Sequence, residues 1–141
     1  MIRSFTEADM DAVLSIWLDA SIKAHHFVAA EFWQSQVNNM RNTYIPASDV
    51  YVYVQGSQVT GFYALHGNNL AAVFVSPDKQ GQGIGKALVN DAKNRRTELT
   101  LSVYQQNQAS YEFYLSQGFN VVSEEIDKNT GCQEYFMCLK R

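Results

Sequence analysis

The sequence predicts a mixed α/β fold in which hairpins and strand–helix–strand crossovers build one sheet. Two segments, residues 49–66 and 119–139, alternate apolar and polar residues around short polar turns, which predicts two antiparallel hairpins. Between them, the uninterrupted apolar run at residues 70–75 leads through a glycine-rich turn into a helix. At 141 residues, the chain has the length of a single domain, and we expect residues 1–141 to form one.

Two helices are expected before the first strand. Thr6 can cap the first helix, and Asp9 suits the positive end of its dipole. The apolar residues of that helix recur at helical spacing: Met10, Val13, Leu14, Trp17 and Leu18. The second helix is expected over residues 29–44, because Pro46 cannot continue it. Its apolar face would hold Trp33, Val37, Met40 and Tyr44.

The remaining elements follow from alternation and from turn residues. Strands are expected at residues 49–55, 59–66, 70–75, 99–104, 119–126 and 132–139. Because residues 70–75 are apolar without alternation, we expect that strand to be buried on both faces. Helices are expected from Ile84 and over residues 107–117, where Gly118 ends the second one.

The composition excludes several classes of function. The net charge of −3 leaves no basic excess for sequence-independent nucleic-acid binding. The two cysteines, Cys132 and Cys138, show no metal-binding spacing and are too few for a disulfide framework, so we expect no metal site. No apolar run has the length of a membrane span, and no signal sequence is recognisable. We therefore expect a cytoplasmic protein without nucleic-acid or membrane partners, either a monomer or a homodimer.

The glycine-rich turn is the segment that points most directly to a ligand. It reads Gln80-Gly81-Gln82-Gly83-Ile84-Gly85-Lys86 and joins a buried strand to a helix. Free amides at a helix start and bare glycine backbone suit a diphosphate. The spacing does not match the P-loop, which needs Ser or Thr after the lysine, or the GxGxxG dinucleotide motif.

A second segment strengthens this interpretation. Residues 107–119 read Asn-Gln-Ala-Ser-Tyr-Glu-Phe-Tyr-Leu-Ser-Gln-Gly-Phe. Together with Gln80-x-x-Gly83-x-Gly85, this segment resembles the two signatures of the Gcn5-related N-acetyltransferase (GNAT) superfamily, and it departs from them only at Ser110, where the family usually has Ala. The resemblance covers most of the chain and implies the GNAT fold, a mostly antiparallel sheet with splayed central strands flanked by about four helices.

The resemblance implies acetyl-CoA (coenzyme A) as cofactor and assigns residues to its binding. The residues carried over are Phe74 and Val75 by their main chain, Gln80, Gly81, Gln82, Gly83, Ile84, Gly85 and Lys86 around the pyrophosphate, and Asn107 and Tyr114 at the pantetheine arm. Asn107 can also cap the helix that it begins.

The mechanism implied is direct attack of an acceptor amine on the thioester within a ternary complex. Tyr114 lies two helical turns after Asn107 and would protonate the departing sulfur. The residues at 68–72 hold no Glu, so the base is a histidine, for which we favour His25, or a water chain. A role for His25 in ordering its loop is the alternative. No acyl-cysteine is expected, because neither cysteine has a recognisable companion base.

The acceptor side implied by the resemblance lies around the first two helices and the last hairpin. We expect an aromatic cleft with carboxylates at its edge, formed by Trp17, His25, Phe27, Glu31, Trp33, Tyr63 and Glu134. Such a cleft attracts a cation. The layout is similar to small bacterial protein and peptide amine acetyltransferases, which makes a protein or peptide lysine the leading acceptor. A small amine (polyamine, amino acid or aminoglycoside-like) and a non-catalytic acyl-CoA sensor remain as alternatives.

Overall fold

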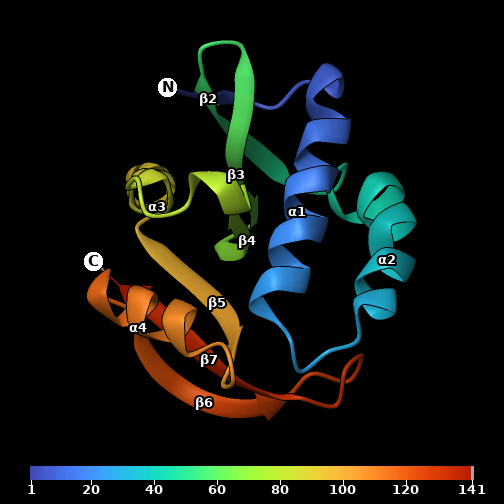
Figure 1. Cartoon of the computed structure of the whole chain (residues 1–141). Coiled ribbons are helices and arrows are strands. Elements are labelled where there is room, and N and C mark those ends of the chain that lie inside the picture. Colours follow the sequence, from blue (N-terminus) through green and yellow to red (C-terminus); the bar gives the residue numbers. More distant parts are fainter. Residues whose placement is uncertain (141) are drawn as a thin grey trace.

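The computed structural model describes residues 1–140 and contains one seven-stranded sheet with the strand order β1-β2-β3-β4-β5-β7-β6 (Figure 1). The strands are β1 (Ile2–Ser4), β2 (Asp49–Gln55), β3 (Gln58–His66), β4 (Asn69–Val75), β5 (Glu98–Tyr104), β6 (Asn120–Ile126) and β7 (Gln133–Lys140). Neighbouring strands are antiparallel except β4 and β5, which are parallel. The expected mixed, mostly antiparallel sheet is confirmed.

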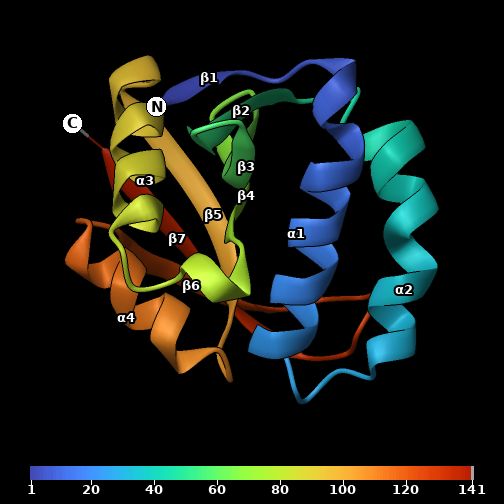
Figure 2. The ribbon, with the colours of Figure 1, turned by 45° about the horizontal axis from the view of Figure 1, so that its top comes forward.

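Four α-helices cover the two faces of the sheet: α1 (Met10–Ala24), α2 (Ala30–Asn39), α3 (Ile84–Arg95) and α4 (Gln108–Ser116). Helices α1 and α2 lie on one face, and α3 and α4 lie on the other (Figure 2). Each face has its own apolar core. Trp17 and Phe62 belong to the core under α1 and α2, whereas Leu88 and Leu101 belong to the core under α3 and α4.

The sheet opens between its two parallel strands. β4 and β5 are in register at one pair alone, Asn69 and Thr100, after which they diverge. The edge of β4 that faces β5 is therefore unpaired over residues 70–75, while its other edge remains paired with β3. The splay implied by the resemblance is confirmed, and it creates the space in which the candidate site lies.

Several elements differ from the expectations. Strand β1 was not predicted, and it pairs with β2. The helix expected over residues 29–44 ends as α2 at Asn39 and continues as one π-helical turn, closed by a bond from the Ile45 amide to the Met40 carbonyl. Tyr44 is exposed rather than part of the apolar face, because this wider turn changes the helical phase.

One further local expectation needs correction. β4 is not buried on both faces: Ala71 is exposed and residues 72–75 are half-buried, because part of the strand lines a cavity. At the start of the first helical segment, Thr6 is the N-cap and forms a capping box with Asp9, whose carboxylate accepts from the Thr6 amide and hydroxyl, as the sequence predicts. Within residues 1–140, none of the helices has the length and apolarity needed to cross a lipid bilayer.

Candidate active site

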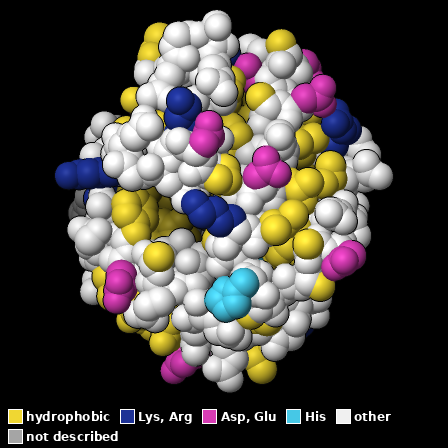
Figure 3. All heavy atoms as spheres, in the orientation of Figure 1, with side chains coloured by type: hydrophobic (Ala, Val, Ile, Leu, Met, Phe, Trp, Pro, Cys, Tyr) yellow, Lys and Arg dark blue, Asp and Glu magenta, His cyan; other side chains and the backbone are white. Residues whose placement is uncertain are grey.

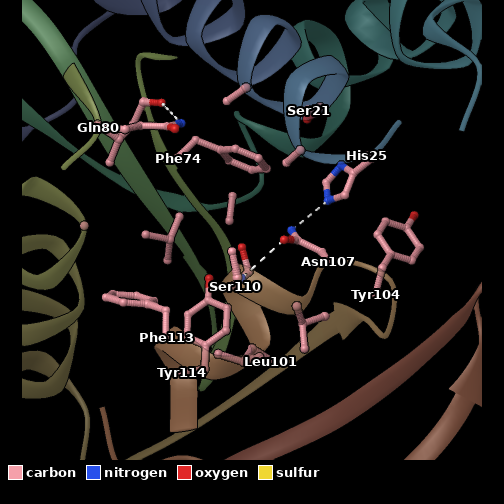
Figure 4. Close-up of a pocket in the computed structure, with 18 of the residues that line it drawn as sticks. Ser21, His25, Phe74, Gln80, Leu101, Tyr104, Asn107, Ser110, Phe113 and Tyr114 are labelled. Atoms are coloured by element: carbon pink, nitrogen blue, oxygen red, sulfur yellow. Dashed lines mark hydrogen bonds between the residues drawn. The ribbon is translucent and has the colours of Figure 1, made fainter. Parts of the chain in front are cut away.

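A cavity of about 1070 Å³ fills the gap between β4 and β5 and is lined by residues from both faces of the sheet (Figure 4). On the surface, its region shows as a hollow with hydrophobic side chains and a basic side chain beside it (Figure 3). Most residues predicted to hold a cofactor line it: Phe74, Val75, Gln80, Gly81, Gly83, Ile84, Gly85, Lys86, Asn107 and Tyr114. Gln82 is outside this lining, and its side chain accepts a hydrogen bond from Gln55 at 3.4 Å.

The glycine-rich turn has the backbone geometry that its sequence suggests. Gly81 and Gly83 both have φ of 83°, in the left-handed region that other residues rarely adopt. α3 begins directly after Gly83, so its first amides have no acceptor in the preceding chain. Added to the helix dipole, these amides form a site that suits the oxygens of a diphosphate.

Gln80 holds this turn to its neighbours on both sides. Its amide nitrogen donates to the Val75 carbonyl at 3.2 Å, and its oxygen accepts from the Lys23 ammonium at 3.3 Å. Lys23, Lys79 and Lys86 all line the cavity and add positive charge beside the turn. Neither Lys23 nor Lys79 was predicted. Nothing in the sequence places Lys23, at the end of α1, next to the glycine turn, whereas Lys79 directly precedes that turn and was overlooked.

Asn107 connects the cofactor side of the cavity to α1. Its side-chain oxygen accepts from the Ser110 amide at 3.3 Å, which confirms the predicted capping of α4. That bond directs the Asn107 amide nitrogen toward Nε2 of His25, 3.2 Å away. Because an amide nitrogen can only donate, Nε2 of His25 is the acceptor, and the imidazole is the neutral tautomer protonated at Nδ1.

His25 is buried, with 7% of its surface exposed, and is surrounded by aromatic rings. The rings of Trp33 and Tyr104 lie 5.1 Å and 5.0 Å from it, between centroids. Burial lowers the pKa of His25 to about 4, and the Ser21 carbonyl offsets only part of this effect. A neutral imidazole whose Nε2 lone pair already accepts from Asn107 is poorly arranged to take a proton from a substrate. The geometry favours its role in ordering the loop over the role of base.

Tyr114 lies on the inner side of α4, with its ring packed edge-on against Phe113 and Phe119. Its hydroxyl points into the cavity (Figure 4). Burial raises the pKa of Tyr114 well above its usual value, so the hydroxyl stays protonated and available as a donor at neutral pH. This is the property needed by a group that donates to a departing sulfur.

The residues expected to form the acceptor cleft come together only in part. Trp17, His25, Trp33 and Glu134 line the cavity, and Tyr104, which was not predicted, lines it beside them. Three residues do not lie there. Phe27 and Glu31 are outside the lining, and Tyr63 is fully buried on the opposite face, bonded to Asp91 and Arg95 against α3. Strand alternation places Tyr63 on one face of β3 but does not tell which face that is.

The chain matches the family model described as "Acetyltransferase (GNAT) domain" over residues 11–139. It belongs to the GNAT family of N-acetyltransferases. GNAT enzymes move an acetyl group from acetyl-CoA to an amine. Among relatives of known sequence, this GNAT chain is 35% identical to the peptidyl-lysine N-acetyltransferase YiaC of Escherichia coli strain K12 over 123 residues, 86% of this chain and 84% of YiaC. It is 30% identical to the peptidyl-lysine N-acetyltransferase YjaB of the same organism over 128 residues, 89% of this chain and 86% of YjaB.

Solved structures show the same GNAT fold. The apo form of YjaB from Escherichia coli superimposes with a TM-score of 0.86 at 28% identity, over 98% of this chain and 95% of that one. The PaiA N-acetyltransferase from Thermoplasma acidophilum, solved in complex with coenzyme A, superimposes with a TM-score of 0.82 at 18% identity, over 100% and 98% of the two chains.

Proposed function

We propose that this enzyme transfers the acetyl group of acetyl-CoA to the side-chain amine of a lysine in a protein or peptide, by direct attack in a ternary complex. The observation that carries the proposal is the single cavity that joins two different halves. The glycine turn and Tyr114 line the half suited to the thioester, and aromatic rings with the carboxylate of Glu134 line the half suited to a cationic acceptor. The two relatives named as peptidyl-lysine acetyltransferases support the choice of acceptor.

The cofactor half has a role for each predicted group. The pyrophosphate would take the amides of residues 80–86, with charge from Lys23, Lys79 and Lys86. The pantetheine arm would pair with the free edge of β4, as a strand would. Its thioester carbonyl would accept from the amide of Val75, and its sulfur would lie next to the Tyr114 hydroxyl. Asn107, already fixed by Ser110, would hold a pantetheine amide.

Direct attack needs no covalent enzyme intermediate. Cys132 and Cys138 are half-buried free thiols, and neither lines the cavity. A thiol outside the cavity cannot reach a thioester that is bound inside it. The acetyl group would therefore pass straight from sulfur to the acceptor nitrogen.

An acceptor screen tests this proposal. Thiol release from acetyl-CoA would be followed with lysine peptides, polyamines, free amino acids and aminoglycosides as separate acceptors. We expect turnover with lysine peptides and acetylation of the lysine side chain. Turnover confined to a small amine would contradict the acceptor class, and absence of turnover despite tight acetyl-CoA binding would favour a non-catalytic sensor.

A further inference from the structure

Glu134 is the one carboxylate that lines the cavity, within residues 1–140. It lies near the start of β7, directly opposite Tyr104 of β5 in the antiparallel ladder. Residues directly opposite in such a ladder project from the same face of the sheet. The ring of Tyr104 contacts His25 and Trp33, so Glu134 shares the face that is covered by α1 and α2, on the acceptor side of the cavity.

The charge of Glu134 has no cationic partner in the described part of the chain. The neighbours of Glu134 are acidic. Asp127 lies in the turn between β6 and β7, and Glu125 is the residue directly opposite Glu134 on β6. Asp127 is occupied by a hydrogen bond from the Tyr104 hydroxyl, whereas no hydrogen bond to the Glu134 carboxylate is found within residues 1–140. A half-buried carboxylate next to two others is stabilised by a cation that enters the cavity.

Two polar side chains beside the same cavity also lack hydrogen-bond partners. Ser21 and Trp33 line it, and the Ser21 hydroxyl and the Trp33 indole nitrogen are buried and form no hydrogen bond within the described residues. Ser21 is 0% exposed and Trp33 is 7% exposed. Buried polar atoms are normally satisfied; these two are not, although neither atom is exposed to the cavity.

The other candidate bases in the cavity are ruled out by their chemistry. Ser102 faces the cavity from β5, but a serine hydroxyl does not take a proton at neutral pH. The Nε2 atom of His25 already accepts from Asn107. Burial raises the pKa of Tyr104 and of Tyr114, so both hydroxyls keep their protons at neutral pH. Lys23, Lys79 and Lys86 lie beside the glycine turn, on the cofactor side of the cavity. Among the side chains that line the cavity within residues 1–140, Glu134 is the candidate base that remains.

We propose that Glu134 binds the ammonium of the acceptor and removes its proton before the attack. This inference rests on the proposed function, because it requires an amine acceptor in the cavity. One ammonium proton passes to the Glu134 carboxylate, and the freed nitrogen lone pair forms the C–N bond to the thioester carbon. The C–S bond then breaks, and the sulfur takes its electron pair and the Tyr114 proton. Tyr114 recovers the second amine proton, and Glu134 releases the first to solvent.

The environment of Glu134 suits this task. Burial raises the pKa of Glu134, and the negative charges of Asp127 and Glu125 raise it further. A carboxylate of raised pKa is a stronger base, closer to the range in which acid–base catalysis is efficient near neutral pH. The other titratable groups that face it are Tyr104, which stays protonated, and His25, which stays neutral at that pH.

The test compares Glu134→Gln with Glu124→Gln across pH. Glu124 is on the same hairpin, bonds Gln105 and lies outside the cavity, so its variant removes a matched charge. We expect Glu134→Gln to lower turnover at pH 7 by about a hundredfold while acetyl-CoA affinity, measured by calorimetry, is unchanged. Its residual rate should rise by about tenfold per pH unit up to pH 9, because only free amine reacts and lysine titrates near 10.4. Glu134→Asp should keep the flatter wild-type profile.

The outcomes separate this inference from the proposed function. A Glu134→Gln enzyme with wild-type turnover and pH profile would overturn the inference. A Glu134→Gln enzyme with a raised KM but an unchanged kcat and pH profile would also overturn the inference, because Glu134 would then only bind the acceptor. If the wild type acetylates a small amine but no peptide, the acceptor class is wrong, and the same variants are then compared with that amine, which also needs deprotonation.

Discussion

Protonation of His25 should destabilise the protein in mildly acidic solution. The imidazole is 7% exposed, and burial holds its pKa at about 4, against 6.5 in an unfolded chain. Between these two values the unfolded chain binds more protons than the folded one. The free energy of unfolding therefore falls as the pH drops from about 6.5 to about 4.

The size of the effect follows from these two pKa values. Each pKa unit corresponds to about 1.4 kcal/mol, so the His25 contribution is at most about 3.4 kcal/mol once the pH is below 4. At pH 5 the same two-state linkage gives a loss of about 2 kcal/mol. The ion pair of Asp9 with Arg3 does not contribute in this window, because the pKa of Asp9 is about 2 and its effect appears below about 3.8.

Urea unfolding at pH 7.5 and pH 5.0 measures this loss, with His25→Gln as the matched variant. Glutamine keeps an acceptor for the Asn107 amide but does not titrate. The wild type should lose about 2 kcal/mol more than the variant over this range, and the carboxylate contributions cancel in the comparison. An equal pH dependence in the two proteins would refute the burial of a neutral imidazole at this position.

The remaining predictions concern the cavity. Tyr114→Phe should lower acetylation tenfold or more with unchanged acetyl-CoA affinity, and equal turnover in the variant would remove Tyr114 from the mechanism. Gly83→Glu should abolish acetyl-CoA binding in calorimetry, because a side chain at φ of 83° costs about 1–2 kcal/mol and its carboxylate repels the diphosphate. Gly56→Glu, in another turn with φ of 62°, is the matched control and should bind normally. Asn107→Ala should cost about 1 kcal/mol in urea unfolding, since α4 loses its cap; an unchanged midpoint would show that the cap contributes nothing.

Sequence patterns predicted the sheet well because most of its signals are local. The strand at 49–55 was placed without error, the strand expected at 132–139 is shifted by one residue at both ends, and the other expected strands differ by one residue at one end. Alternation, glycine turns and Pro46 act over a few residues and need no knowledge of distant contacts. β1 was missed because its three residues carry too little pattern and depend on pairing with β2.

The cofactor half of the site was also accessible from the sequence, since the glycine turn and the Asn107–Phe119 segment are contiguous motifs. The acceptor half was harder to predict from the sequence, because its residues come from α1, α2, β5 and β7, which are far apart in the chain. The bond between His25 and Asn107 joins residues 82 positions apart, and no local pattern announces it. No local pattern places Lys23 beside Gln80 either. Tyr63 was assigned to the wrong face of the sheet, because alternation does not tell which face of β3 it lies on.

Intact-mass spectrometry of the enzyme with acetyl-CoA, before and after a lysine peptide is added, tests the direct transfer most directly. If transfer is direct, the enzyme mass stays unchanged in both samples, and the peptide gains one acetyl group at its lysine. An enzyme that itself becomes acetylated and then passes the group to the peptide, or a peptide that is never modified, would contradict it.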